Sequence, residues 1–231
     1  AGTTTPAAFD EVLANYDHAM LLFEQLQNPV EAAAPHIDAK AAPQAAVTRV
    51  PHEERDWAPC SLQQQRTWFL EETNPDQVSQ NLPSAFRFKG KIDRLALEKS
   101  LDAIVARQPS MRTWVELKDG LPVQRVLPKY EVRLPAQDLS TLPDATREAE
   151  LMTRLRAAAN ERILMSQAPM FRAQYFVLSE KESVLFFMTH HSIWDGWSFD
   201  IFLDELARHY EAFTTGKQPD VPALPVTYQD F

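Results

Sequence analysis

The chain has 231 residues, 45% of them hydrophobic and 24% charged, which suffices for one well-packed domain with an appendage. Its 23 basic and 32 acidic residues give a formal net charge of −9, and no basic cluster interrupts the acidity, so we expect no nucleic-acid partner. Cys60 is the single cysteine and cannot form an internal disulfide. No signal-like amino terminus or membrane-length apolar run is present, so we expect a cytoplasmic protein that does not insert into a membrane.

The chain divides near residue 51. Apolar residues at helical spacing predict an amphipathic helix within residues 1–27, and residues 28–51 are rich in Ala and Pro without an apolar period, which is typical of a linker. The helix is the tail of an upstream domain, a docking element for a partner, a cloning-boundary sequence or a surface helix folded onto the main domain. The main domain is expected over residues 52–231.

Helices and strands are predicted to alternate through the first half of this domain. Lys118, Asp119 and Gly120 form a hairpin signal between two apolar runs. The predicted elements are a helix over Ser61–Glu71, a strand over Ala85–Lys89, a helix over Leu95–Val105, and hairpin strands over Thr113–Leu117 and Val123–Leu127.

The second half predicts a charged helix over Asp144–Leu164 and two adjacent antiparallel strands, Met170–Leu178 and Ser183–Thr189. A last helix is predicted over Phe199–Phe213, with Ser198 as its amino-terminal cap. Helices that follow strands with hairpin connections indicate an α+β fold, a two-layer mixed sheet with helices.

The most informative motif joins the last predicted strand to the last predicted helix. His190 and His191 precede Ser-Ile-Trp and then Asp195 and Gly196, which gives the pattern HHxxxDG. The run VLFFMT before it is continuously apolar, as in a strand buried on both faces. Because consecutive strand residues point to opposite faces, the two histidines cannot both address one small substrate. We therefore expect one histidine to be chemical and the other structural.

The chemistry that suits this motif is acyl transfer. A neutral imidazole can take a proton from an attacking amine or hydroxyl, and backbone N–H groups near Gly196 could face a developing oxyanion. The alternative without chemistry is a pair of core histidines above a tight turn. A metal site is disfavoured, because adjacent strand histidines splay apart and no further ligand cluster has suitable spacing.

Four segments together resemble the condensation domains of nonribosomal peptide synthetases. Residues 178–213 resemble the active-site segment of that family, and the chain ends within a segment similar to its YxDYAxW motif. The likeness covers residues 57–231, and the other matching segments are SLQQQRTW (Ser61–Trp68), similar to SxxQxRxW, and Asn81–Thr113, similar to a strand, a helix and the RHExLRT motif.

The resemblance implies that residues 52–231 are the truncated amino-terminal lobe of a two-lobed domain. This lobe would be chloramphenicol-acetyltransferase-like, with the reaction in a tunnel between lobes. His191 would be the catalytic histidine, which positions or deprotonates the acceptor amine or stabilises the tetrahedral intermediate. His190 and Asp195 would be architectural, with Arg66 as the expected partner of Asp195, and Gly196 would leave room beside the pantetheine channel. The implied reaction is amide-bond formation between carrier-bound thioesters.

The resemblance also implies what the protein binds. The substrates would be presented on the 4'-phosphopantetheine arms of donor and acceptor carrier proteins, with no cofactor or metal bound by this chain. Further partners would be the second lobe of the same domain and, through residues 1–27, an upstream synthetase subunit. Because the second lobe forms one wall of the tunnel, we expect the isolated chain to be inactive.

One segment departs from the family pattern. Arg107, Gln108 and Pro109 stand where Arg-His-Glu is usual, which indicates a changed supporting shell around intact chemistry. Two alternatives stay open: a coenzyme-A-dependent acyltransferase of the HxxxDG group, and a non-catalytic lobe that binds carrier proteins.

Overall fold

The computed structural model describes residues 57–74 and 77–230, so the predicted helix within 1–27 and the linker over 28–51 lie outside the described residues. The described strands form two sheets, one of four strands in the order β2-β7-β6-β5 and one of three in the order β1-β4-β3. The elements are β1 (Trp57–Pro59), α3 (Leu62–Thr73), β2 (Asn81–Lys89), α4 (Arg94–Arg107), η2 (Pro109–Arg112), β3 (Thr113–Lys118), β4 (Leu121–Val126), β5 (Ala136–Asp138), α5 (Asp144–Ala159), β6 (Phe171–Ser179), β7 (Glu182–His190), α6 (Gly196–Thr215) and η3 (Tyr228–Asp230).

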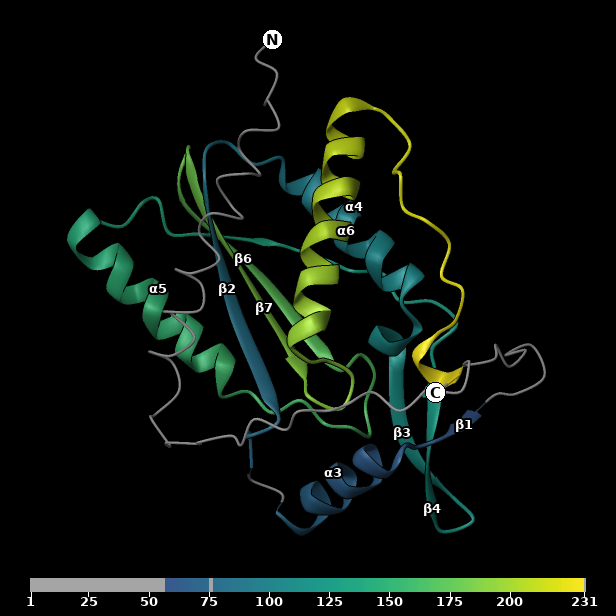
Figure 1. Cartoon of the computed structure of the whole chain (residues 1–231). Coiled ribbons are helices and arrows are strands. Elements are labelled where there is room, and N and C mark those ends of the chain that lie inside the picture. Colours follow the sequence, from purple (N-terminus) through teal and green to yellow (C-terminus); the bar gives the residue numbers. More distant parts are fainter. Residues whose placement is uncertain (1–56, 75–76, 231) are drawn as a thin grey trace, which may run out of the picture.

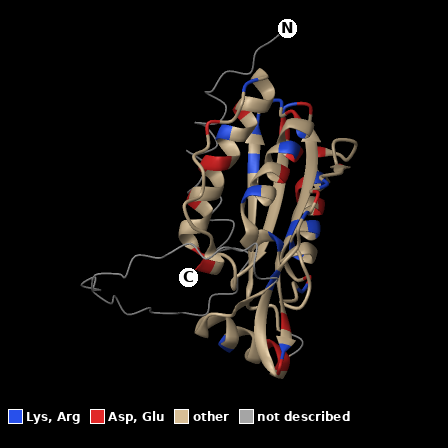
Figure 2. Cartoon of the chain, turned by 90° about the vertical axis from the view of Figure 1, so that its right-hand side faces the viewer, with Lys and Arg blue, Asp and Glu red and all other residues tan. Residues whose placement is uncertain are grey.

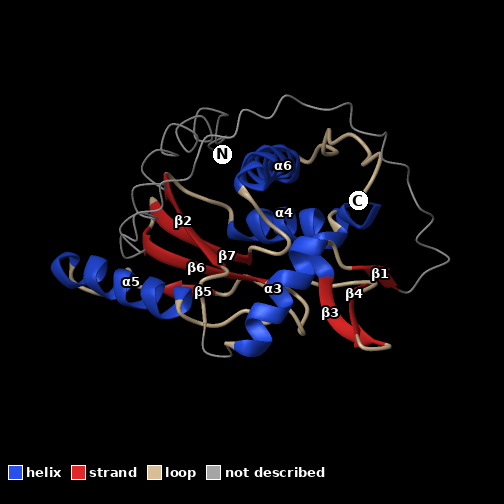
Figure 3. Ribbon diagram, turned by 60° about the horizontal axis from the view of Figure 1, so that its bottom comes forward, coloured by secondary structure: helices blue, strands red, loops and turns tan. Residues whose placement is uncertain are grey.

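Helices cover both faces of the four-stranded sheet. Helices α4 and α6 lie side by side over one face and α5 lies on the other (Figures 1 and 3). Strand β7 pairs antiparallel with β2 and β6, whereas β5 joins β6 in parallel, so the sheet is mixed. Every residue of β7 after the first is buried, because helices cover it from both sides. The α+β class and the doubly buried strand are confirmed.

The predicted hairpin is present as β3 and β4. Asp119 and Gly120 connect its strands, with φ angles of 53° and 78°. A two-residue turn with positive φ at both positions matches the twist of the paired strands, and Asp-Gly is among the sequences that favour it. Strands β1 and β5 have three residues each, too few to show a periodic pattern, and they are absent from the sequence prediction.

Two helix ends differ from prediction by three residues or more. Helix α5 ends at Ala159, whereas the sequence predicts that it reaches Leu164. The side-chain amide of Asn81 donates hydrogen bonds to the carbonyls of Ala159 and Glu161, at 3.0 and 2.9 Å, which ties the chain to β2 instead of continuing the helix. Helix α6 begins at Gly196 rather than Phe199, because Asp195 and not Ser198 is its cap.

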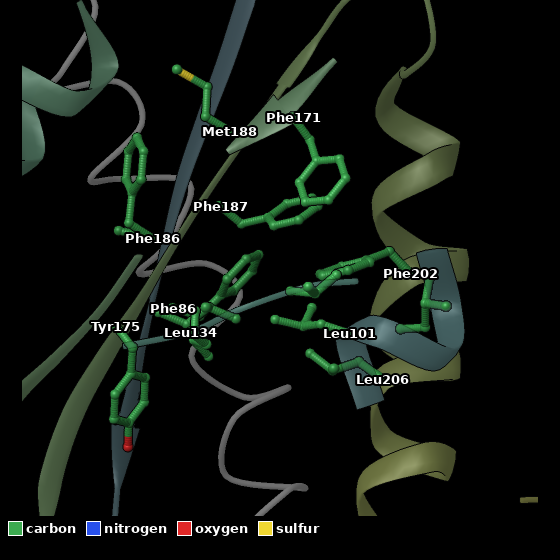
Figure 4. Close-up of a cluster of buried hydrophobic side chains, with 14 of the residues drawn as sticks. Phe86, Leu101, Leu134, Phe171, Tyr175, Phe186, Phe187, Met188, Phe202 and Leu206 are labelled. Carbon is green, nitrogen blue, oxygen red and sulfur yellow. The ribbon is translucent and has the colours of Figure 1, made fainter. Parts of the chain in front are cut away.

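The main core lies between the four-stranded sheet and helices α4 and α6. Figure 4 shows Phe171 and Phe187 directed toward α6, whereas Phe186 and Met188 point to the other side of the sheet. The ring centroids of Phe187 and Phe202 are 4.5 Å apart. This packing holds the start of α6 against the end of β7 and so positions the loop that joins them.

Charges are interspersed over the described part of the chain. Basic and acidic residues occur on the same helices and strands (Figure 2), and several form ion pairs, such as Arg87 with Glu148 at 2.6 Å. None of the helices in the described residues has the length and apolar character needed to cross a bilayer.

Candidate active-site loop

The HHxxxDG segment forms the loop between β7 and α6. Strand β7 ends at His190 and α6 begins at Gly196. His190 is 0% exposed, whereas His191, immediately after the strand, is exposed to solvent. The two adjacent imidazoles therefore occupy opposite environments, because β7 is buried on both faces up to His190 and His191 lies in the turn beyond the strand end.

Polar contacts engage both ring nitrogens of His190. The Nε2 atom lies 2.6 Å from Glu71 Oε1 on α3, and the Nδ1 atom lies 2.7 Å from Ser192 Oγ. The backbone N–H of Ser192 donates to Nδ1 at 3.1 Å. An Nδ1 that accepts this bond leaves the hydrogen on Nε2, which donates to the Glu71 carboxylate. His190 is thus a buried structural group with no nitrogen left for a substrate.

His191 has the opposite arrangement. Its Nδ1 atom lies 3.0 Å from the carbonyl oxygen of Trp194. A carbonyl only accepts, so the hydrogen resides on Nδ1 and the Nε2 lone pair has no partner among the described residues. The backbone N–H of His191 donates to the carbonyl of Gln80 at 2.8 Å, which fixes the loop beside β2. An exposed imidazole with a fixed tautomer and an unoccupied lone pair can accept a proton.

Asp195 caps α6. Its Oδ1 accepts hydrogen bonds from the backbone N–H of Ser198 at 2.9 Å and from the Ser198 hydroxyl at 2.7 Å. Ser198 Oγ in turn accepts from the backbone N–H of Asp195 at 3.1 Å, which completes a capping box. A Cβ added at Gly196 would meet no described atom within 4 Å, so the space beside it is open.

The expected pair between Arg66 and Asp195 is wrong for this structure. Arg66 is exposed on α3, whereas the residues that α3 buries are Gln64, Thr67 and Glu71. At 3.6 residues per turn, Arg66 lies about 200° around the helix from Gln64 and faces away from the loop. The Asp195 carboxylate instead binds the first turn of α6.

Glu71 and Gln64 contact the HHxxxDG loop, and the sequence did not reveal these contacts. Gln64 Nε2 lies 3.4 Å from the Ser192 carbonyl and 3.1 Å from Gln124 Oε1. These two side chains lie on one face of α3, separated by seven residues, or about two helical turns. Gln64 belongs to the SxxQxRxW-like segment. The signal that could have revealed Glu71 was its position seven residues after Gln64, which places both polar side chains on the same face of the helix.

The segment that departs from the family pattern lies at the end of α4 beside α6. Arg107 Nε and Gln108 Nε2 both donate to Glu205 Oε1, at 2.9 and 3.0 Å. A pocket of about 100 Å³ lies between α4, η2, the loop and α6, and its lining includes Gln108, Trp194 and Glu205. In this chain Gln108 therefore joins α4 to α6 through the buried Glu205 carboxylate.

Neither Cys60 nor a metal site adds a second reactive group in the described part of the chain. Burial raises the pKa of the Cys60 thiol to about 11, which disfavours the nucleophilic thiolate. Within residues 57–74 and 77–230, no cluster of three or more His, Cys, Asp and Glu side chains could hold a metal ion.

Comparison with known proteins identifies the family. A family model described as the condensation domain matches residues 54–231. The chain belongs to the condensation-domain family. It is 35% identical over 182 residues to chondramide synthase cmdD of Chondromyces crocatus, an alignment that covers 79% of this chain and 5% of that protein. It is also 33% identical over 173 residues to cyclosporin synthetase simA of Tolypocladium inflatum, covering 74% of this chain and 1% of that protein.

Solved structures agree with this assignment. A structure described as the complex of the X-domain and OxyB from teicoplanin biosynthesis matches with a TM-score of 0.69 and 26% identity, over 82% of this chain and 40% of that chain. The starter condensation domain of rhizomide synthetase RzmA has the same fold, with a TM-score of 0.66 and 20% identity over 72% of this chain and 42% of that chain. The family and the fold expected from the sequence are confirmed. The chain spans 1–15% of the length of the curated relatives it matches, and 38–42% of the matched structures.

Proposed function

We propose that the complete protein forms amide bonds by transferring a carrier-bound acyl or peptidyl thioester to the amine of a carrier-bound aminoacyl acceptor. The observation that supports this best is the contrast between the two histidines. His190 is sealed in the protein, whereas His191 is exposed, with Nδ1 engaged by a carbonyl and Nε2 unoccupied. That arrangement suits a group that receives a proton from the acceptor amine.

In this proposal the acceptor nitrogen attacks the donor thioester carbonyl carbon. A C–N bond forms, the C–S bond breaks, and the donor's pantetheine leaves as a thiol. The nitrogen loses one proton to His191 Nε2, and the leaving sulfur takes up one proton. His191 thus acts by accepting the proton and by orienting the amine, while the second lobe supplies the other wall of the site.

The contacts support the roles proposed for the other residues of the motif. His190 anchors the loop from inside the core, and Asp195 fixes the first turn of α6. The open space at Gly196 leaves room for a pantetheine arm. Carrier proteins and the second lobe are the proposed partners, and a further synthetase chain upstream is the proposed partner of residues 1–27. A cytoplasmic location is part of the proposal and rests on the single cysteine.

The test measures product formation by the complete condensation domain with both substrates loaded on carrier proteins. His191→Ala should lower kcat by about 10²- to 10⁴-fold, the usual contribution of a positioned proton acceptor. His209→Gln is the matched control, because it removes a different imidazole, one that lies on α6 and outside the loop. It should leave kcat unchanged at pH 7.5. Full activity of His191→Ala would refute the catalytic role.

The same assay separates the two acyltransferase alternatives. Carrier-bound thioesters should react, whereas the same acyl groups on free coenzyme A should react far more slowly. Comparable rates with both would favour the coenzyme-A-dependent alternative.

A protein-binding module is the second candidate, and one finding favours it: a matched X-domain is described in a complex with OxyB. If the domain only recruits proteins, loaded carriers will bind to it without any peptide product, and His191→Ala will not change their affinity.

A further inference from the structure

Helix α3 buries polar residues, whereas an ordinary surface helix buries apolar ones. Its buried residues are Gln64, Thr67 and Glu71, at 0%, 4% and 7% exposure, whereas Leu62 and Phe69 are 84% and 61% exposed. A surface helix normally turns an apolar stripe toward the core. Burying polar groups is costly unless each one has a partner. The buried polar side chains of α3 therefore require specific polar partners.

Glu71 finds its main partner in His190. Its Oε1 lies 2.6 Å from His190 Nε2, 119 residues away in the chain, and the histidine is completely buried. The Ser192 N–H bond to Nδ1 leaves the hydrogen on Nε2, so the carboxylate accepts it. Hydrogen bonds with one charged partner are stronger than neutral ones.

The second oxygen of Glu71 is also held. Glu71 Oε2 accepts from the backbone N–H of Met165 at 3.4 Å, and Arg162 Nη2 lies 3.9 Å from it. Both contacts come from the segment that follows α5. The carboxylate is therefore contacted by a segment separate from the β7–α6 loop as well as by the imidazole.

His190 transmits this anchoring to His191 through short covalent and hydrogen-bonded paths. The two residues are adjacent in the chain. The His190 carbonyl accepts a hydrogen bond from the Ile193 N–H at 3.1 Å, and the His190 ring accepts one from the Ser192 N–H. Trp194, whose carbonyl holds His191 Nδ1, follows directly. A shift of the His190 ring would move the turn that orients His191.

We propose that Glu71 is a positioning residue for the reaction, acting through His190 to hold the turn that presents His191. This inference rests on the proposed role of His191. Glu71 itself is buried, so it is expected to act through His190 rather than on the substrate. Misplacement of a reacting group by about 1 Å can lower a rate by about 100-fold, so its loss should affect the chemical step.

The first experiment compares Glu71→Gln and Glu71→Ala with Glu72→Ala in the complete condensation domain, using carrier-loaded substrates. Glu72 is the matched control, because it is the next residue on α3 and is exposed. Both Glu71 variants should lower kcat by about 10- to 100-fold with little change in KM. Glu71→Gln keeps the side-chain shape and one acceptor oxygen, so it tests the carboxylate where Glu71→Ala fails to fold. Wild-type kcat in Glu71→Gln and in folded Glu71→Ala would overturn the proposal.

A double-mutant cycle separates positioning from general damage. If Glu71 acts through His191, Glu71→Gln should have no further effect on kcat in the His191→Ala background. An equal fold loss in both backgrounds would mean that Glu71 supports the structure alone, and would overturn the inference.

A second readout does not depend on activity. Diethyl pyrocarbonate, with peptide mapping by mass spectrometry, should modify His191 but not His190 in the wild-type chain. In Glu71→Gln, His190 should become reactive at urea concentrations where the fold remains intact, and in Glu72→Ala it should not. If His191→Ala keeps full activity but this pattern appears, the proposed function fails while the anchoring stands. Unchanged protection of His190 in Glu71→Gln would overturn the anchoring.

Discussion

The ring of Phe187 on β7 stacks on the ring of Phe202 on α6, with centroids 4.5 Å apart and planes inclined by 16°. Phe187 also lies 5.6 Å from the Trp194 ring, measured between centroids. One side chain at the centre of the sheet thus contacts both the loop and the helix that follows it. The candidate site is built on this aromatic cluster, and its geometry depends on the core beneath it.

Phe187→Ala should lower the free energy of unfolding by about 3–5 kcal/mol, because it removes a fully buried ring and leaves a cavity. Urea denaturation followed by circular dichroism measures the loss. Trp197→Ala is the control, since this side chain is 83% exposed, and it should change stability by no more than about 0.5 kcal/mol. Similar losses in the two variants would contradict the packing described for β7 and α6.

Asp195→Ala should destabilise the chain by about 1 kcal/mol, because α6 loses the cap at its first turn. Asp195→Asn should lose less, since asparagine also caps helices well. Arg66→Ala should leave stability unchanged, because Arg66 is exposed and faces away from Asp195. Urea midpoints for the three variants check this, and a matching loss in Arg66→Ala would restore the ion pair that the structure contradicts.

Local patterns predicted most of the described fold. The run before His190 is apolar on every residue from Val184 to Met188, which correctly predicted a doubly buried strand. The two histidines do occupy different environments, but the cause is the end of the strand at His190 and not the alternation of its faces. Asp119 and Gly120 correctly indicated a hairpin, because their positive φ angles are a local property of the turn. Signals of this kind depend on neighbours in the chain, which a single sequence contains.

Long-range polar contacts could not be predicted in the same way. Glu71 and His190 are 119 residues apart, and nothing near either residue specifies the other. A charged Arg66 beside Trp68 suggests burial, but the turn of the helix directs Gln64 and Glu71 inward instead. The predicted cap of α6 is three residues too late because Asp195 and Ser198 are both good caps, and the capping box uses both.

Arg107 and Glu205 should be energetically coupled. Glu205→Ala removes the carboxylate that accepts from both Arg107 and Gln108, and should cost about 1.5–3 kcal/mol, the range for hydrogen bonds to charged groups. Arg107→Ala and the double variant complete a cycle measured by urea denaturation. The double variant should lose less than the two single losses added together. Additive losses would mean that Arg107 and Glu205 are not energetically coupled.

His209 should make the fold sensitive to mild acid. Burial lowers the pKa of His209, with Glu205 opposing this and Arg107 adding to it. Because the folded pKa lies below the unfolded value of about 6.5, both states are neutral above that pH and no penalty arises. As the pH falls below about 6.5, the unfolded chain binds the proton first, and the free energy of unfolding decreases. Urea midpoints at pH 7.5 and 5.5 should therefore fall further for wild type than for His209→Gln, and an equal fall in both would show that another group causes the acid sensitivity.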